Sequence, residues 1–318
     1  MTASLRVRSL AKINLDLRVL NKRPDGFHEL RTIFQTISLA DTIGIEYQRG
    51  RTRIDVNGNL NIPDNLIVQA ADKVLRTARK TGRLRFHLTK RIPLGSGLGG
   101  GSSNAASVLL ALPVLLGKPL SLDRLLELAA ELGSDVPFFL IGGTAVGLGR
   151  GTELYPLADV AARHALVITP GIHSATPEAY RALDRESACE PPPSLVRAFQ
   201  PVAWQIESHW LNPGSAWTND FESVVFREHS QLKSIKGKLQ KLGARPALMS
   251  GSGSALFGMF SSRELRDRAF DSFRKEFDKD KVHRVTMVSR SRYRALWRQQ
   301  LGVSSKSKLW PPQDRYAK

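Results

Sequence analysis

The chain of 318 residues contains a single cysteine, Cys189. One cysteine can form neither an internal disulfide nor a cysteine-based zinc cluster, so the composition excludes a disulfide-stapled secreted domain and favours a reducing compartment, the cytoplasm.

Long apolar runs are also missing from the sequence. No window approaches the about 18 consecutive apolar residues of a membrane span, and residues 1–12 carry charges where a signal peptide needs an apolar stretch. We therefore expect neither secretion nor a membrane-spanning segment.

Acidic residues are scarce: 29 Asp and Glu stand against 47 Lys and Arg, which gives a formal charge of +18. Residues 281–318 hold ten basic residues and one acid, Asp314, so this stretch alone contributes +9. Such a run is typical of a solvated basic face and tail. A nucleic-acid-binding protein is the alternative that this charge raises, but the sequence contains no matching recognition motif.

The apolar content of 42% is enough for a substantial core. At roughly 150 residues per domain, the length predicts two domains or one large one. We expect a boundary near residues 155–165, with an N-terminal domain at 1–160, a second domain at 161–300 and a basic tail at 301–318. Residues 187–217 show little pattern and are rich in Pro and Trp, so they are expected to form a long loop with helical pieces.

Local periodicity predicts a mixture of strands and helices. Apolar and polar residues alternate over 12–19, which predicts a strand with Lys12 and Asn14 on one face. Pro24-Asp25-Gly26 predicts a turn before a second apolar run at 30–39. The other expected elements are helices at 65–81 (ended by Gly82), 121–132 (capped by Ser121 and ended by Gly133) and 223–242, and strands at 84–88, 165–169 and 247–260, the last interrupted by a turn.

Five glycines occur in the seven residues from Gly95 to Gly101, between a predicted strand and an apolar helix. We expect Ser102 or Ser103 to cap that helix and Pro113 to kink or end it. A backbone without Cβ atoms at a helix N-terminus suits the binding of phosphate. The loop is therefore predicted to bind an anion.

Three common nucleotide motifs do not account for this loop. Gly95, Gly97 and Gly100 satisfy G-x-G-x-x-G, but a second helix follows where a dinucleotide-binding fold needs a parallel strand ending in an acid. No G-K-[ST] closes the run, which excludes a P-loop. The signature motifs of protein kinases, His-Arg-Asp and Asp-Phe-Gly, are also missing.

The loop from Pro93 to Ala106 resembles the second motif of the GHMP superfamily of small-molecule kinases. The resemblance covers about residues 5–300 and is narrowed by further runs: Ala11-Lys12-Ile13-Asn14-Leu15, Pro24-Asp25-Gly26-Phe27-His28-Glu29-Leu30, Leu132-Gly133-Ser134-Asp135-Val136-Pro137-Phe138-Phe139, Asn219-Asp220-Phe221-Glu222 and Met249-Ser250-Gly251-Ser252-Gly253-Ser254. These runs resemble the branch that uses ATP to phosphorylate the 2-hydroxyl of 4-diphosphocytidyl-2-C-methyl-D-erythritol in non-mevalonate isoprenoid biosynthesis.

The resemblance implies a two-lobed α/β (α+β) fold, with a left-handed βαβ unit in the N-terminal lobe and a ferredoxin-like C-terminal lobe. It also implies that Asp135 is the catalytic base and that Lys12 lies beside it. An ammonium group there keeps the carboxylate ionised and polarises the acceptor hydroxyl. Because aspartate is a weak base at neutral pH, positioning is expected to matter more than early proton removal.

The expected ATP site follows from the same resemblance. Asn65 and Lys90 lie in segments that line the adenine side in the family. No protein cage for a metal is expected; Mg²⁺ would arrive with ATP and meet a hydroxyl such as that of Ser103. The glycine-loop residues that would hold the phosphates are Pro93, Leu94, Gly95, Ser96, Gly97, Leu98, Gly99, Gly100, Gly101, Ser102 and Ser103.

The acceptor site implied by the resemblance is a cytosine clamp. Phe27 and Tyr180 match its two rings and His28 matches the residue that reads the edge of the base; Phe27 stands where some members have Tyr, which keeps stacking and removes a hydroxyl. Asn14 and Thr176 match polar contacts to the substrate. Gly251-Ser252-Gly253 matches the third family motif, whose backbone closes over substrate and nucleotide.

The expected partner is therefore a small molecule, with no membrane and no nucleic acid. The glycine loop by itself cannot choose an acceptor, so another GHMP kinase of the homoserine or mevalonate type remains the alternative.

Overall fold

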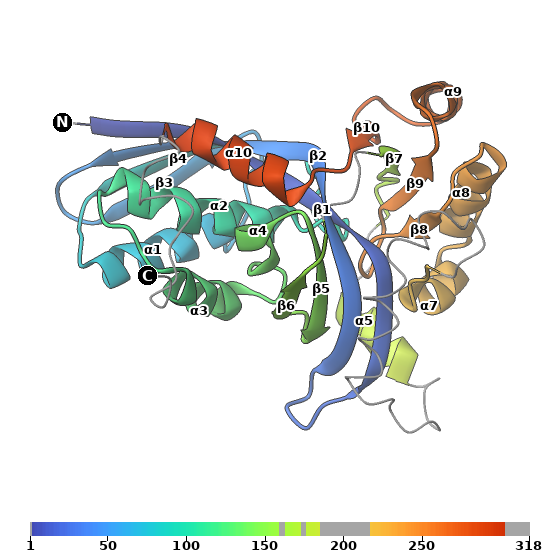
Figure 1. Cartoon of the computed structure of the whole chain (residues 1–318), viewed down its shortest axis with the longest axis horizontal. Coiled ribbons are helices and arrows are strands. Elements are labelled where there is room, and N and C mark those ends of the chain that lie inside the picture. Colours follow the sequence, from blue (N-terminus) through green and yellow to red (C-terminus); the bar gives the residue numbers. More distant parts are fainter. Residues whose placement is uncertain (1, 159–162, 173–175, 185–216, 303–318) are drawn as a thin grey trace.

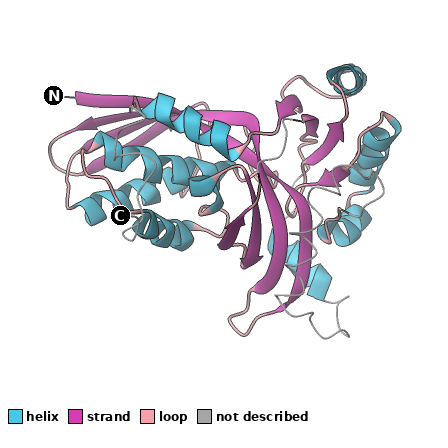
Figure 2. Ribbon diagram, viewed as in Figure 1, coloured by secondary structure: helices cyan, strands magenta, loops and turns pink. Residues whose placement is uncertain are grey.

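The computed structural model of the protein describes residues 2–158, 163–172, 176–184 and 217–302, which form two lobes (Figure 1). The expected loop at 187–217, apart from Trp217, and nearly all of the expected tail lie outside the described residues. Each lobe contains one sheet, with helices packed against it (Figure 2). Within the described ranges, no helix combines the length and the apolar character that a bilayer span requires.

Two long strands form the central hairpin of the first lobe. β1 (Thr2–Lys22) and β2 (His28–Gln48) pair antiparallel along their length, and the expected turn at Pro24-Asp25-Gly26 joins them. β1 extends well beyond residues 12–19. Its polar face near Lys12 is buried rather than open to water, because the glycine loop and the second lobe cover it.

The other edge of β2 pairs with two different strands. Its first half pairs with β5 (Thr144–Gly149) and its second half with β4 (Arg83–Thr89); β6 (Glu153–Pro156) extends the sheet beyond β5. β3 (Arg53–Gly58) runs parallel to β4, and α1 (Leu66–Ala78) connects them. These three elements are the βαβ unit of this lobe.

The helices of the first lobe pack around its core. α2 (Gly100–Leu115) is buried on nearly all sides between the hairpin, α1 and α3 (Leu122–Leu132), and the short α4 (Phe138–Ile141) follows α3. α3 confirms its expected bounds: the Ser121 hydroxyl accepts from the amide of Arg124, and the helix ends at Gly133. This end places the loop that carries Asp135.

The start of α2 corrects the prediction that Ser102 or Ser103 caps this helix. The helix begins at Gly100, and its N-cap is Gly99 at φ +69°, a conformation that favours glycine. The Ser103 hydroxyl instead donates to the Leu10 carbonyl (2.6 Å) on β1. α2 also continues two residues past Pro113. The first amides of α2 therefore have no side-chain cap.

The second lobe has a four-stranded antiparallel sheet in the order β10-β7-β9-β8. Helices separate β7 from β8 and β9 from β10, so the lobe has the βαββαβ arrangement of a ferredoxin-like fold. Its elements are β7 (His164–Ile168), α5 (Thr176–Asp184), α7 (Phe221–Glu228), α8 (Ser230–Lys241), β8 (Ala247–Met249), β9 (Leu256–Phe260), α9 (Arg263–Arg274) and β10 (Val282–Thr286).

Two expected helix bounds are wrong. The helix predicted at 223–242 is two helices, α7 and α8, because His229 takes a non-helical conformation (φ −129°, ψ 73°). The buried residues Val225 and Leu232 are seven apart, so their spacing fits one helix as well as two. α1 ends at Ala78 with Arg79 in the left-handed region, not at Gly82. A Cβ at Gly82 would overlap the Tyr47 ring, so that glycine serves packing.

The chain returns to the first lobe at its last described helix, α10 (Arg290–Leu301), which runs along β1 (Figure 1). Tyr293, Trp297 and Leu301 join the core of the first lobe, and the Tyr293 hydroxyl donates to the Phe139 carbonyl (2.5 Å). The amide of Arg8 on the outer edge of β1 donates to Gln300 Oε1 at 2.6 Å. α10 thus covers an edge strand that would otherwise be open.

A shared core fixes the two lobes to each other. Ile13 and Ile33 of the first sheet pack in one cluster with Phe257 and Met287 of the second lobe. Backbone bonds also cross between the lobes, as from the Val288 amide to the Thr36 carbonyl (2.9 Å). A site built from both lobes can therefore be held in one geometry.

We predict that Trp297→Ala lowers the free energy of unfolding by about 3–5 kcal/mol, because it leaves a cavity between α10 and the first lobe. Urea unfolding followed by circular dichroism measures this value. Arg294→Ala, at an exposed position of the same helix, is the control and should change it by less than about 0.5 kcal/mol. If Trp297→Ala lowers the free energy of unfolding no more than Arg294→Ala does, the Trp297 side chain does not stabilise the core.

Candidate active site

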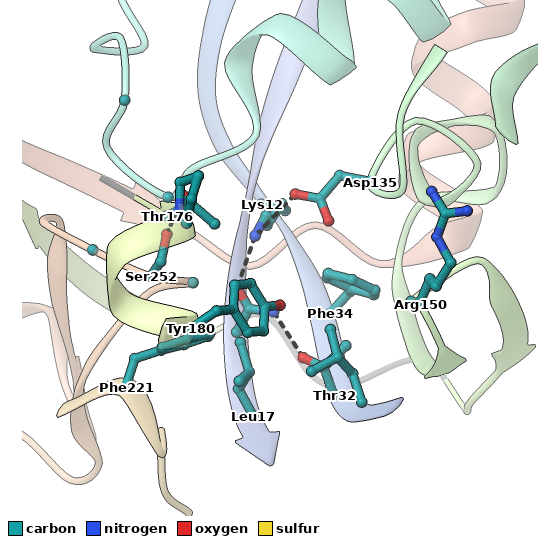
Figure 3. Close-up of a pocket in the computed structure, with 18 residues that line it drawn as sticks. Lys12, Leu17, Thr32, Phe34, Asp135, Arg150, Thr176, Tyr180, Phe221 and Ser252 are labelled. Atoms are coloured by element: carbon teal, nitrogen blue, oxygen red, sulfur yellow. Dashed lines mark hydrogen bonds and ion pairs between the residues drawn. The ribbon is translucent and has the colours of Figure 1, made fainter. Parts of the chain in front are cut away.

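An ion pair between Lys12 and Asp135 lies where the two lobes meet (Figure 3). Lys12 comes from β1 and Asp135 from the loop after α3, and Lys12 Nζ lies 3.3 Å from Asp135 Oδ2. The Lys12 side chain is 4% exposed, whereas that of Asp135 is 33% exposed. The Asp135 carboxylate is therefore accessible to a ligand, and the buried Lys12 amine is paired with that carboxylate on its protein side.

A chain of hydrogen bonds holds the Lys12 amine in place. Lys12 Nζ donates to Asn14 Oδ1 (2.7 Å), and Asn14 Nδ2 donates to Thr32 Oγ1 (2.7 Å). The Thr32 hydroxyl in turn donates to the Asp16 carbonyl (2.8 Å). The ring of Phe34 lies 5.4 Å below the amine. A buried ammonium needs such partners, and here they also aim it at Asp135.

The glycine loop lies directly against this pair. The Lys12 amide donates to the Leu98 carbonyl (3.0 Å), and a Cβ at Gly99 would come within 3.1 Å of the Lys12 side chain. Gly95, Gly97 and Gly99 all have positive φ, from +61° to +76°. These conformations bring a bare backbone and the uncapped N-terminus of α2 to the site, which is the arrangement that binds phosphate.

The third motif of the sequence closes the loop from the second lobe. Ser250 Oγ donates to the Gly97 carbonyl (2.9 Å), and the Ala255 amide donates to the Ser96 carbonyl (3.1 Å). A Cβ at Gly97 would lie 2.0 Å from the Ser250 carbonyl oxygen, so only glycine fits there. The loop is thus fixed on both sides rather than free.

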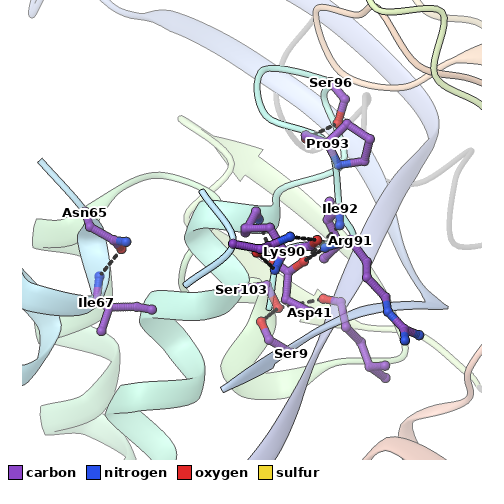
Figure 4. Close-up of polar contacts among 12 residues, drawn as sticks. Ser9, Asp41, Asn65, Ile67, Lys90, Arg91, Ile92, Pro93, Ser96 and Ser103 are labelled. Atoms are coloured by element: carbon purple, nitrogen blue, oxygen red, sulfur yellow. Dashed lines mark hydrogen bonds and ion pairs between the residues drawn. The ribbon is translucent and has the colours of Figure 1, made fainter. Parts of the chain in front are cut away.

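Several of the predicted nucleotide residues have structural partners of their own (Figure 4). Lys90 forms a buried ion pair with Asp41 (2.5 Å), beside Gly100 at the start of α2. The Asn65 side chain accepts from the Ile67 amide and caps α1. Ser103, which is buried, accepts from the Ser9 hydroxyl and donates to Leu10. Ser102 is partly exposed.

Two adjoining cavities meet at Asp135. One, of about 420 Å³, is lined by Lys12, Asn14, Gly97 and the Gly251–Gly253 turn. The other, of about 540 Å³, is lined by the predicted aromatic residues and histidine of the acceptor site, Phe27, His28 and Tyr180. Asp135, Arg150, Thr176 and Tyr180 line both cavities. A ligand spanning both would pass the carboxylate.

The aromatic residues predicted for the acceptor site lie in two stacks. The His28 ring stacks on the Tyr180 ring at 4.6 Å and 21°. Burial, and next the charge of Asp135, raises the pKa of Tyr180 to about 12, so this ring stays neutral at physiological pH. Phe27 is 48% exposed, and the Arg150 guanidinium lies 3.7 Å over its ring.

Sequence reasoning did not single out Arg150. The available signal was Gly149-Arg150-Gly151, a cation between two glycines at the end of an apolar strand. Thr176, which was predicted, faces the third motif: its hydroxyl lies 2.7 Å from that of Ser252 (Figure 3). The structure therefore brings Lys12, Asn14, Asp135, Thr176 and Tyr180 around one cavity, with Phe27 and His28 on the adjoining one.

Comparison with known proteins agrees with this geometry. The family model "GHMP kinases N terminal domain" matches residues 65–143, and "GHMP kinases C terminal" matches residues 205–279. The 4-diphosphocytidyl-2-C-methyl-D-erythritol kinase of Solibacter usitatus (strain Ellin6076) is 51% identical over 320 residues, which cover 99% of this chain and 98% of the relative.

Solved structures show the same likeness. A crystal structure of 4-(cytidine 5'-diphospho)-2C-methyl-D-erythritol kinase has a TM-score of 0.73 and 36% identity, and the match covers 89% of this chain and 99% of that one. A homoserine kinase from Cytophaga hutchinsonii has a TM-score of 0.64 at 20% identity, covering 90% and 95%, which shows the fold alone. The chain therefore belongs to the GHMP kinases and, within them, to the family of 4-diphosphocytidyl-2-C-methyl-D-erythritol kinases.

Proposed function

We propose that this protein transfers the γ-phosphoryl group of ATP to the 2-hydroxyl of 4-diphosphocytidyl-2-C-methyl-D-erythritol. The observation that carries the proposal is the Lys12–Asp135 pair, which lies beside the glycine loop and between the two cavities. Phosphoryl transfer to an alcohol needs a phosphate cradle, in-line positioning and an acceptor for the hydroxyl proton. The site offers a residue or a backbone group for each of these needs.

The phosphates of ATP would lie on the glycine loop. The backbone of residues 95–101 and the first amides of α2 supply donors, and the dipole of α2 favours negative charge at this end. The Lys90 amine lies behind Gly100, where its charge is paired with that of Asp41. We assign Asn65 and Lys90 to the adenine side, at the start of α1 and after the end of β4.

Magnesium would enter with the nucleotide. Among the described residues, no group of three or more His, Cys, Asp or Glu side chains could hold a metal ion, so phosphate oxygens would have to supply most of its ligands. Both hydrogen bonds of the Ser103 hydroxyl are within the protein. The partly exposed Ser102, in the first turn of α2, would therefore be a better source of a protein ligand than Ser103. Bound Mg²⁺ would neutralise charge on the β- and γ-phosphates.

Asp135 would accept the proton of the acceptor hydroxyl, and the Lys12 ammonium would stabilise the developing alkoxide. The bonds from Lys12 to Asn14 and from Asn14 to Thr32 fix the amine before the substrate arrives. Such preorganisation removes a reorganisation cost at the moment of transfer.

The cytidine end of the substrate would occupy the cavity lined by Phe27, His28 and Tyr180. Stacking of a base on an aromatic ring contributes about 1–3 kcal/mol. Because His28 already stacks on Tyr180 and Arg150 on Phe27, the base would have to displace or extend one of these stacks. Thr176 and Asn14 would contact the phosphates or the alcohol. This water-soluble substrate fits the cytoplasm that the single cysteine favours.

Acceptor choice tests the proposal against the homoserine and mevalonate alternatives. In a coupled assay of ADP release, we expect turnover with 4-diphosphocytidyl-2-C-methyl-D-erythritol and none with homoserine or mevalonate. CDP, which has the base and the diphosphate without the acceptor alcohol, should compete with the acceptor. Turnover of mevalonate or homoserine, with no inhibition by CDP, would contradict the proposal.

We predict that Asp135→Asn lowers kcat by about 10²- to 10⁴-fold, because a positioned base contributes about that factor, while the KM for ATP changes little. Steady-state kinetics on folded variant measures both constants. Asp278→Asn, the same change at an exposed position, is the matched control and should behave as the unaltered protein. A kcat within about tenfold of the unaltered protein would show that Asp135 is not the base.

A further inference from the structure

The run Asn219-Asp220-Phe221-Glu222 has no place in the proposed chemistry, yet Asn219 is 4% exposed at the junction of the lobes. Asn219 Nδ2 donates to the carbonyls of Met249 (2.8 Å) and Gly251 (2.7 Å), and Asn219 Oδ1 accepts from the Phe221 amide (3.0 Å). Both amide protons and the amide oxygen are used. A carboxylate of the same shape could not make the two donor bonds.

The two carbonyls bonded by Asn219 bracket Ser250, which is the residue that touches the glycine loop. Ser250 Oγ donates to the Gly97 carbonyl and accepts from the Asn14 amide (3.3 Å). A Cβ at Gly251 would lie 3.3 Å from Gly97 Cα and 3.6 Å from Lys12 Nζ. The part of the turn that Asn219 holds is thus bonded to the phosphate loop through Ser250, and at Gly251 it leaves little space beside the Lys12 amine.

The backbone around Asn219 is tied to the strand that carries Lys12. The Leu17 amide donates to the Thr218 carbonyl (2.8 Å), and the Asp220 amide donates to the Leu17 carbonyl (3.1 Å). The Asp220 carboxylate also accepts from the Val19 amide (2.9 Å). Asn219 is therefore fixed relative to β1, and its side-chain bonds hold the Ser250–Gly253 turn of the second lobe in a fixed position relative to the same strand.

The neighbours of Asn219 strengthen the same link. Glu222 Oε1 accepts from the Met249 amide (2.8 Å), so both backbone groups of Met249 are held by this segment. The Phe221 ring meets the Tyr180 ring edge-on at 4.8 Å (Figure 3). One short segment thus touches the strand of the catalytic lysine, the closing turn and an aromatic residue of the acceptor cavity.

We propose that Asn219 is a positioning residue for phosphoryl transfer: its side-chain amide sets the Ser250–Gly253 turn against Gly97 and Lys12, so that the nucleotide and the acceptor are aligned. This inference rests on the proposed function. It does not make Asn219 a catalytic residue, because both amide protons and the amide oxygen of its side chain are bonded to backbone groups of the protein.

The test is Asn219→Asp, which keeps the shape of the side chain and places an oxygen against two carbonyls. We expect kcat to fall by about 10²-fold, the effect of a misplacement of about 1 Å at a reacting centre. The KM for ATP should change much less, because the loop amides remain. Asn57→Asp, the same change at an exposed position of β3, is the matched control and should leave kcat unaltered.

Amide hydrogen exchange of the full chain gives a readout that needs no activity. In Asn219→Asp, the amides of Ser250 and Gly253 should exchange faster, while the amide of Val167 in the central strand β7 should not change. Unchanged turn amides together with unchanged kcat would overturn the inference, and so would faster exchange throughout the second lobe, which indicates a general loss of stability. If Asn219→Asp does not fold, Asn219→Ala removes the same donors without adding charge, and the same readouts decide.

The exchange measurement also separates this inference from the proposed function. An unaltered protein that fails to phosphorylate the cytidine substrate would refute the proposed function. Faster exchange confined to the Ser250–Gly253 turn of the variant would still support the role of Asn219 in positioning that turn. Unchanged exchange of the turn amides would still refute that role.

Discussion

A buried ammonium group sets the main constraint on this structure. Lys12 Nζ has almost no contact with water and must be compensated, and its partners are the Asp135 carboxylate and the Asn14 amide. Loss of a partner would leave the buried Lys12 amine less compensated, which is costly. The elements that carry these residues must therefore meet: the long β1–β2 hairpin and the loop that begins where α3 ends at Gly133.

The second constraint is closeness of backbone to backbone. Gly97 and Gly99 leave no room for a Cβ, because Ser250 lies against one, and Phe139 and Lys12 lie against the other. For this reason the loop is a rigid part of the interface between the lobes, although five of its seven residues from 95 to 101 are glycine. Both lobes share one apolar cluster, and α10 returns to cover β1 and to bond the carbonyl of Phe139, close to the loop of Asp135. The glycines of the loop and the aromatic residues of α10 therefore both help to hold the two lobes, and the site between them, in one arrangement.

Much of this arrangement could be predicted from local patterns. The strand through Lys12, the Ser121 cap of α3 and the glycine loop before α2 each have a signal in neighbouring residues. The approach of Lys12 to Asp135 has no such signal, since the two lie more than a hundred positions apart in the sequence, and its prediction came from resemblance. Patterns failed where tertiary contacts decide: Ser103 bonds to β1 rather than capping α2, and His229 interrupts an apolar spacing that fits one helix. Arg150 was missed because only the fold brings it over Phe27.

The central claim is that Lys12 and Asp135 act as one unit on the acceptor alcohol. A double-mutant cycle with Lys12→Met, Asp135→Asn and the double variant, followed by kcat/KM for the cytidine acceptor, tests this most directly. Residues that act together are strongly non-additive, so the account predicts that the double variant is no slower than the slower single variant. Losses that multiply in the double variant would mean that the two residues act independently, and would contradict it.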